Sequence, residues 1–332
     1  MDGILVVEKP VGPTSHDVVA LVRRLSGTKR VGHGGTLDPF ASGVLPLFLG
    51  RATRMLEYHL GDGKAYRATV CFGAGSTTDD LEGELSPAGQ APERATVEAA
   101  LGAFRGEIVQ TPPAFSAIKV GGRRAYALAR SGETPVLAPR TVTISRIDIV
   151  EWDGSDPERP IAVLEVECSA GTYVRAIARD LGVAAGSAAY LGGLVRTASG
   201  PFALPAARTL DGVREAAAEG RLASLLLPAD AGLEELPSIR LTEAEIAEVA
   251  RGRFVTPSDR PSAGGPEARY RLLDADGRLV AMGALRGGRV APDKVFVDAP
   301  GASSGGPVDP VALSERDPAP SVDPDPASPD GA

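Results

Sequence analysis

Apolar and polar residues follow one another in two periods along this chain, one suited to strands and one suited to helices. Residues 4–7 are continuously apolar and short enough for a buried strand, and the prolines and glycine of residues 10–13 then require a loop. The next apolar positions fall on one helix face: Val18, Val19, Leu21, Val22 and Leu25. Thr14 or Ser15 can cap the start of this helix, and Gly27 is suited to its end.

The same patterns predict further elements of both kinds. Helices are expected at 51–60, 93–104, 124–131 and within 171–182, and strands at 64–73, 106–109, 140–152 and 161–168. After a linker-like stretch at 225–237, a smaller region is expected at 238–298. It would hold a helix near 242–251 and strands near 269–273, 278–285 and 294–297, with a hairpin turn at residues 274–277.

Composition fits a globular protein of 332 residues, 43% hydrophobic and 23% charged, with one large domain and a smaller one. No apolar run approaches the roughly 20 residues of a membrane-spanning helix, and no basic segment followed by a long apolar core begins the chain. Cys71 and Cys168 match no zinc-binding spacing. We therefore expect a cytoplasmic protein without a cofactor or metal, and a monomer, since no feature indicates an obligate partner.

Charge is unevenly distributed. The net charge is −8, but residues 301–332 contribute −5 and leave −3 for residues 1–300. This tail has seven prolines and few large apolar side chains, which predicts disorder. Residues 119–146 carry a net charge of +5. A basic segment of this kind can bind phosphates, although a solvated charged face is equally compatible with it.

Candidate chemistry is concentrated in residues 32–43, GHGGTLDPFASG. Glycines permit unusual backbone angles and close approach of a ligand, while Pro39 restricts both itself and Asp38. A carboxylate on a stiff, exposed turn can act as a nucleophile or a base. The same pattern is also ordinary turn chemistry, in which Asp bonds its own backbone.

The string GHGGTLDPFASGVLPLFLGRATR resembles the signature of the bacterial tRNA pseudouridine synthases of the TruB family. Four other segments match in the same order: VEKPVGPTS at residues 7–15, KAYR at 64–67, TPPAFSAIK at 111–119 and GTYVR at 171–175. Together the matches cover about residues 3–200. The resemblance implies isomerisation of uridine to pseudouridine at position 55 in the T loop of tRNA, with no cofactor and with the tRNA T stem-loop as partner.

The resemblance also implies an α+β fold. A mixed, mainly antiparallel central sheet flanked by helices would form a catalytic domain over residues 1–235. An insertion at about 110–140 would close on the RNA like a thumb, and a small PUA-like β domain would occupy residues 238–298.

Asp38 is implied as the essential catalytic residue. Tyr66 would stack on the target uracil, and Arg175 would pair with Asp38. An aromatic residue in a strand is usually part of the core, and a helical arginine usually forms a surface ion pair, so these residue types alone do not decide between the readings.

Four further residues are implied in substrate binding. Leu191 would line the uracil pocket, and His33 would fill space left by flipped nucleotides. Lys9 and Tyr173 would support the pocket.

Contacts to the RNA backbone are expected from Lys119, Arg123 and Arg124 in the insertion. Arg196 is the remaining candidate in the strand that follows residue 190. Relatives often carry charged residues where this chain has Gly192, Gly193 and Val195.

Two alternatives stay open on the residues alone. A non-catalytic RNA-binding or tRNA-folding protein could use the same groove. A carboxylate glycosidase would normally need a second acid working with Asp38, and the sequence shows no obvious one.

Overall fold

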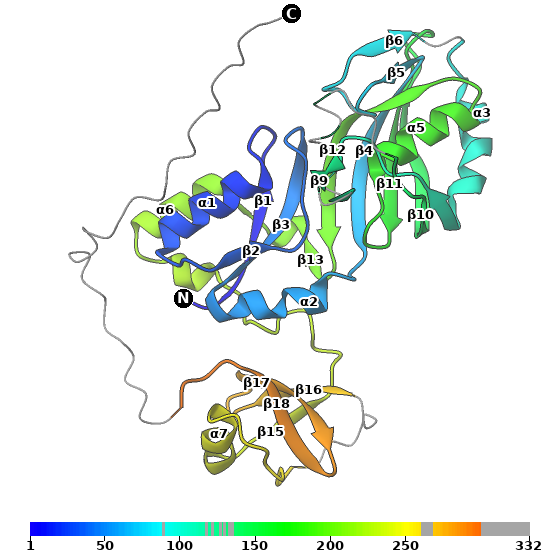
Figure 1. Ribbon diagram of the computed structural model, residues 1–332. Coiled ribbons are helices and arrows are strands. Elements are labelled where there is room, and N and C mark those ends of the chain that lie inside the picture. The colour runs from blue at the N-terminus through cyan, green and yellow to red at the C-terminus, as the bar shows by residue number, and fades with distance from the viewer. Residues whose placement is uncertain are drawn as a thin grey trace, which may run out of the picture.

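The structure, a computed structural model, describes residues 1–87, 90–116, 119–120, 123–125, 128, 131, 136–259 and 268–299. Within this part the chain forms a large ten-stranded sheet and a four-stranded sheet close to the C-terminal end (Figure 1). Two short pairs of strands lie outside both sheets.

The large sheet has the strand order β14-β1-β3-β12-β4-β11-β10-β7, with β2 paired to β3 and β13 paired to β12. Its strands are β1 (Gly3–Lys9), β2 (Val31–His33), β3 (Ala41–Leu49), β4 (Lys64–Phe72), β7 (Gly106–Gln110), β10 (Arg140–Asp153), β11 (Ile161–Cys168), β12 (Ala189–Ser199), β13 (Phe202–Ala203) and β14 (Arg208–Thr209). Two pairings are parallel, β1 with β14 and β3 with β12, and the others are antiparallel. The expected mixed, mainly antiparallel sheet is confirmed.

The remaining elements complete the described chain. The helices are α1 (Ser15–Ser26), α2 (Leu56–His59), α3 (Arg94–Ala100), α5 (Val174–Ala184), α6 (Leu210–Ala218) and α7 (Glu243–Ala250), with 3-10 turns η1 (Gly50–Met55), η2 (Leu101–Phe104), η3 (Leu204–Ala206) and η4 (Leu222–Leu225). The small sheet holds β15 (Ser238–Arg240), β16 (Arg269–Leu273), β17 (Leu279–Arg286) and β18 (Arg289–Val295), and the short pairs are β5 (Ala74–Ser76) with β6 (Leu85–Pro87) and β8 (Lys119–Val120) with β9 (Arg123–Arg124).

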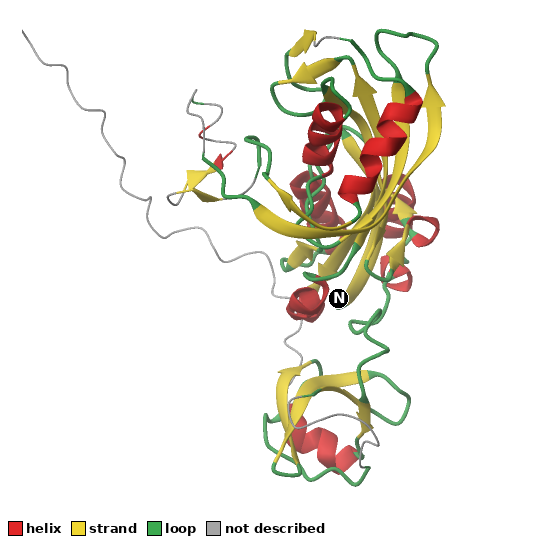
Figure 2. Ribbon diagram, turned by 90° about the vertical axis from the view of Figure 1, so that its right-hand side faces the viewer, coloured by secondary structure: helices red, strands yellow, loops and turns green. Residues whose placement is uncertain are grey.

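The large sheet has two halves that meet where β3 pairs with β12. In one half, α1 and α6 cover β1 and β3, and the buried side chains include Leu5, Val22 and Leu45 (Figure 1). In the other half, α3 and α5 cover β4, β10, β11 and β12 (Figure 2). The seam between the two halves brings the loop after β2 close to the start of α5.

The first helix follows the sequence closely. Thr14 caps α1 by accepting a hydrogen bond from the backbone N–H of Asp17, and the Asp17 carboxylate accepts one from the backbone N–H of Thr14. Gly27 ends the helix with φ of +62°. The expected strand at 4–7 and strands at 64–73, 106–109, 140–152 and 161–168 are also found, with ends shifted by up to two residues.

Other expectations were wrong or fall outside the described residues. The helix expected at 51–60 is mainly the 3-10 turn η1, with only four residues in α2, and Leu60 is 64% exposed. The strand expected at 294–297 begins earlier, because Gly287 and Gly288 supply the tight turn before β18. The helix expected at 124–131 and the insertion at 110–140 lie partly outside the described residues, and the tail at 301–332 lies wholly outside them.

The small sheet packs against η1 and α2 of the larger part. The Lys294 ammonium lies 2.6 Å from the Glu57 carboxylate, and Met282 is fully buried in a cluster with Ile4 and Met55. Arg51 donates a hydrogen bond to the backbone carbonyl of Phe296. These contacts join the two parts by both apolar burial and ion pairing.

None of the helices in the described part of the chain is both long and apolar enough to cross a membrane.

Candidate active site

The loop that carries Asp38 runs from the end of β2 to the start of β3 and is held at several points. The backbone N–H of Gly34 donates to the Pro46 carbonyl at 2.9 Å, and that of Gly12 donates to the Pro39 carbonyl at 2.8 Å. The buried Ser15 hydroxyl donates to the Leu37 carbonyl at 3.0 Å and accepts from the Leu37 N–H at 2.9 Å. The loop is therefore fixed on both sides of Asp38.

Lys9 supports the same loop from below. Its ammonium is fully buried and donates to the carbonyls of Pro10, Pro39 and Ala41 at 2.9, 3.4 and 2.7 Å. Burial lowers the pKa of Lys9 to about 8, against an opposing effect of the Asp38 charge. Lys9 thus has the supporting position expected for it, beneath the loop and not at the substrate surface.

Arg196 clamps the loop from β12. Its side chain is 1% exposed, and its guanidinium donates to the carbonyls of Val44, Gly35 and Thr36 at 2.7, 3.1 and 3.4 Å. A guanidinium with this burial and these partners is not available to an RNA phosphate without rearrangement. The position does not favour the expected backbone contact, and points to loop support as the role of Arg196.

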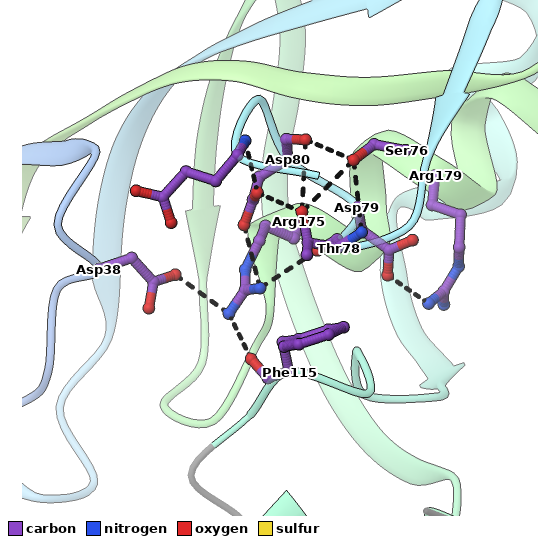
Figure 3. A network of polar contacts seen from close by, with 9 residues as sticks. Asp38, Ser76, Thr78, Asp79, Asp80, Phe115, Arg175 and Arg179 are labelled. Carbon is purple, nitrogen blue, oxygen red and sulfur yellow. Dashed lines mark hydrogen bonds and ion pairs between the residues drawn. The ribbon is translucent and has the colours of Figure 1, made fainter. Parts of the chain in front are cut away.

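The Asp38 carboxylate faces Arg175 across the seam of the sheet. Its side chain is 38% exposed and lies 3.1 Å from the Arg175 guanidinium, which is 7% exposed (Figure 3). Arg175 also pairs with Asp80 at 3.1 Å and donates to the backbone carbonyls of Thr78 and Phe115 at 3.2 and 2.9 Å. The expected pairing of Asp38 with Arg175 is present, and the Asp38 side chain remains partly exposed to solvent.

Asp80 is the residue at this site that sequence reasoning missed. It lies in an acidic loop at residues 76–86, is 3% exposed and pairs with Arg175. Asp79 adopts φ of +62° and pairs with Arg179 at 2.8 Å, and its backbone carbonyl accepts from the Leu191 N–H (Figure 3). One signal in the sequence could have revealed Asp80. Asp79 and Asp80 are adjacent acids, and Arg175 and Arg179 are four residues apart on one helix, so each acid can pair with one arginine.

An open cavity of about 770 Å³ lies beside Asp38. Its wall includes Asp38, Tyr66, Tyr173, Arg175 and Arg196, so five of the expected site residues meet there. Tyr66 comes from β4 and Tyr173 is the residue that precedes α5. The cavity volume suits one nucleoside with part of its backbone.

Burial dominates the electrostatics of the cavity. It raises the pKa of the Asp38 carboxyl, with Arg175 opposing the rise and the Asp80 charge adding to it. It also raises the pKa of the Tyr66 phenol, with the neighbouring Arg196 guanidinium opposing it. Tyr66 is thus a neutral, half-buried aromatic ring beside a carboxylate.

Leu191 does not reach this cavity. It is fully buried among the core residues of β4 and α5, whereas Leu194 lines the cavity. The register of β12 against β4 shifts between Leu191 and Gly193, where a bulge inserts one residue and places Leu194 on the same face of the sheet as Leu191. The pocket-lining role expected of Leu191 therefore falls to Leu194.

His33 stands behind the cavity wall. Its ring packs edge-on against His16, with centroids 5.6 Å apart, and it is His16 that lines the cavity. His16 itself is exposed. Burial lowers the pKa of His33, and the His16 ring adds to this effect.

Three of the four basic residues expected to contact the RNA backbone lie on the short hairpin of β8 and β9. Lys119 pairs with Arg124 in its backbone register, and Arg123 is exposed. The side chains of Lys119 and Arg124 lie outside the described part of the structure.

Solved structures share this fold. The chain matches a chain of a crystal structure of a Cbf5-Nop10-Gar1 complex with a TM-score of 0.67 and 28% identity, covering 89% of this chain and 85% of that one. A structure of an H/ACA RNP bound to a substrate RNA containing 2′-deoxyuridine matches with a TM-score of 0.66 and 26% identity, again over 89% and 85%. The fold therefore places the chain in the structural class of these proteins.

Sequence comparison narrows the class. Residues 23–174 match the family described as TruB family pseudouridylate synthase (N terminal domain). The tRNA pseudouridine synthase B of Arthrobacter sp. (strain FB24) is 45% identical over 89% of this chain and 97% of its own length, and that of Bradyrhizobium diazoefficiens is 41% identical over 89% and 85%. The chain belongs to the TruB family of pseudouridylate synthases, which are isomerases.

Proposed function

We propose that this chain converts uridine 55 in the T loop of tRNA to pseudouridine, with Asp38 as its essential carboxylate. The observation that carries the proposal is the position of Asp38: a fixed, ionisable group, paired with Arg175 at 3.1 Å, on the wall of a cavity that also contains Tyr66. The curated relatives, named tRNA pseudouridine synthase B, support tRNA as the substrate.

The reaction breaks the bond between N1 of uracil and C1′ of the ribose and forms a bond between C5 and C1′. C5 loses its proton and N1 gains one, so the product is an isomer and no redox equivalent or group donor is consumed. Asp38 can attack C1′ or C6, or assist removal of the C2′ proton. Arg175 keeps the carboxylate aimed at the cavity, and its charge opposes the rise in the pKa of Asp38 that burial causes.

The detached uracil must stay within the cavity while it turns. Extrusion of a nucleotide from its stack costs a few kcal/mol, and stacking on an aromatic ring returns about 1–3 kcal/mol. Tyr66 offers such a ring from a strand that is rigid on both sides. We assign Tyr66 the stacking role, and Tyr173, Arg175 and Leu194 the other walls.

We further propose a division of labour along the chain. Residues 1–235 would form the catalytic domain, the basic segment around 110–140 would close on the T stem-loop, and residues 238–298 would form a PUA-like RNA-binding unit. The contacts of the small sheet with η1 and α2 support a fixed position for that unit.

A monomer acting in the cytoplasm is the proposed state. Cys71 and Cys168 are free thiols, which is usual for proteins of reducing compartments.

The direct experiment is incubation of the full chain with an unmodified T-arm RNA, followed by mapping of pseudouridine at each uridine. Modification confined to the position corresponding to 55 is expected. Binding without modification at any position would favour the alternative of a non-catalytic RNA-binding protein.

A further inference from the structure

Arg140, the first residue of β10, occupies a position on the cavity wall that the catalytic groups do not explain. Its guanidinium carbon lies 4.4 Å from the centroid of the Tyr173 ring. A Cβ atom built on Gly171 would lie 3.7 Å from its Nη1. The guanidinium thus lies over the Tyr173 ring and close to Gly171, on the cavity wall near the start of α5.

Within the described part of the structure, the Arg140 side chain has hydrogen-bond donors without a protein partner. Its Nε is buried and has no hydrogen-bond partner, and no hydrogen bond or ion pair joins Arg140 to another residue in the described ranges. The two other arginines of the cavity differ: Arg175 has carboxylate and carbonyl partners, and Arg196 has three carbonyls. Buried donors in native proteins are usually hydrogen-bonded, so a donor without a protein partner on a cavity wall can serve a ligand.

A second unpaired group faces the same cavity. Ser116 is 3% exposed and its hydroxyl has no partner. Its neighbour Phe115 accepts a hydrogen bond from Arg175 at 2.9 Å, which places this segment beside the first turn of α5. The cavity therefore holds an unused cation and an unused hydroxyl.

The start of α5 adds free backbone donors. Tyr173 makes no side-chain cap, and its backbone is clamped by Gln110, whose amide oxygen accepts from the Tyr173 N–H at 2.8 Å and whose amide nitrogen donates to the Tyr173 carbonyl at 3.0 Å. Gln110 lies opposite Arg140 in the pairing of β7 with β10. The first N–H groups of a helix favour anions, and here the stacked Arg140 stands beside them.

We propose that Arg140, Ser116 and the first turn of α5 bind one phosphate of the RNA backbone next to the uridine that Asp38 acts on. The planar fork of a guanidinium matches phosphate oxygens, and its charge is permanent. Arg175 is paired with two carboxylates and Arg196 is buried against three backbone carbonyls, so among the three arginines of this wall Arg140 is the one with donors left for the RNA. The inference rests on the proposed function, since it takes RNA as the ligand.

The test compares the binding of RNAs in which one phosphate at a time is replaced by an uncharged linkage. T-arm RNAs, each with one methylphosphonate at a different position around the target uridine, are titrated with the full chain carrying Asp38→Asn, with and without Arg140→Gln. With Arg140 present, one linkage should weaken binding by about tenfold, as expected for a lost charged hydrogen bond. With Arg140→Gln, neutralising that linkage should cost no further affinity.

Controls separate this role from a structural one. Arg105→Gln changes an exposed arginine that pairs with Asp148 on the sheet, and should leave the sensitive linkage sensitive. Ser116→Ala should weaken binding of the unmodified RNA by a smaller factor and reduce the effect of the same linkage only.

Two outcomes would overturn the inference. In the first, Arg140→Gln weakens the binding of every RNA by the same factor, whichever linkage is neutral. In the second, no neutral linkage has an effect on affinity that depends on Arg140. Failure of the wild-type chain to form pseudouridine would instead overturn the proposed function, while the binding comparison still reports on Arg140.

Discussion

The Asp38 carboxylate and the Arg175 guanidinium, 3.1 Å apart, come from opposite halves of the large sheet. Asp38 is carried by the loop before β3, and Arg175 by the first turn of α5. Asp80 holds Arg175 from the other side at 3.1 Å. The ion pair therefore depends on the packing of β3 against β12, where the two halves meet.

Replacing Asp38 by Asn should abolish isomerisation and leave tRNA binding largely intact. The side chain keeps its shape but loses the carboxylate, so turnover should fall by a factor on the order of 10³ or more. Pseudouridine formation and filter binding with the same T-arm RNA measure the two quantities separately. Turnover close to that of the wild type would remove Asp38 from the mechanism.

The same variant should be at least as stable as the wild type at neutral pH. The pKa of Asp38 is raised in the folded chain, chiefly by burial, so its ionisation disfavours folding once the pH exceeds the value in the unfolded chain. The gain should disappear in acid, where the carboxyl is protonated in both states. Urea unfolding at pH 7 and at lower pH measures this difference, and a clear loss of stability at pH 7 would contradict it.

The acid limb of the pH–rate profile should move in opposite directions in two variants. Activity requires ionised Asp38, whose pKa lies above its ordinary value of 3.8. Asp80→Asn removes a negative charge that raises this pKa, so the limb should shift to lower pH. Arg175→Gln removes the cation that lowers it, so the limb should shift to higher pH.

Stability measurements on the same two variants test the ion-pair network itself. Arg175→Gln leaves Asp80, 4% exposed at its side chain, without its charged partner, which should cost about 3–5 kcal/mol of unfolding free energy. For the activity prediction on the same variants, coincident pH–rate profiles in the wild type and both variants would show that Asp38 does not set the acid limb.

Lys9 should make the protein more stable as the pH rises above about 8. Burial lowers its pKa from 10.5 to about 8, so in that window the folded chain releases a proton that the unfolded chain still holds. The free energy of unfolding should therefore rise with pH from this group, and Lys9→Met should remove that contribution. Urea unfolding between pH 7 and 10 measures it, with Lys29→Met at an exposed position as the control. Parallel pH dependences in wild type and Lys9→Met would contradict the assignment.

Gly43 should not accept any side chain. It has φ of +106°, and a Cβ atom there would lie 2.2 Å from the backbone oxygen of Arg196, its partner in the pairing of β3 with β12. Gly43→Ala should therefore destabilise the fold by about 2 kcal/mol or more and reduce activity by displacing the Asp38 loop. Gly102→Ala, where no atom lies within 4 Å of the added Cβ, is the matched control and should stay within about 1 kcal/mol of wild type.

Sequence reasoning predicted the local features of this fold well. The capping residue Thr14 and the terminating Gly27 are short-range signals, and α1 follows them. The turn at Asp274–Gly277 also follows from local chemistry, with the Gly277 N–H donating to the Asp274 carbonyl at 3.1 Å. The 3-10 turn η1 was missed because its ends are fixed by packing of Met55 under the sheet and not by a local pattern.

The site was predicted where one segment of sequence carries it and missed where several segments meet. Asp38, Tyr66 and Arg175 belong to matched motifs, and they converge as expected. Asp80 and Leu194 do not stand out along the chain, since their positions depend on a positive φ at Asp79 and on a bulge in β12. Arg196 is a similar case, since only the three-dimensional fold shows that its guanidinium is buried and donates to three carbonyls of the loop and β3.

Neutralising the basic hairpin of β8 and β9 should weaken tRNA binding and flatten its dependence on salt. This pair of strands belongs to neither sheet and stands away from the large one (Figure 2), and Arg123 on it is exposed. Each phosphate contact contributes about 0.7–0.9 to the slope of log affinity against log salt, so replacing Arg123 and Arg124 by Gln should lower the slope by about 1.4–1.8. Arg105 and Arg146, which pair with Asp148 on the sheet, provide the control pair of equal charge. An unchanged slope in the hairpin variant, or an equal fall in the control, would exclude the hairpin from the RNA footprint.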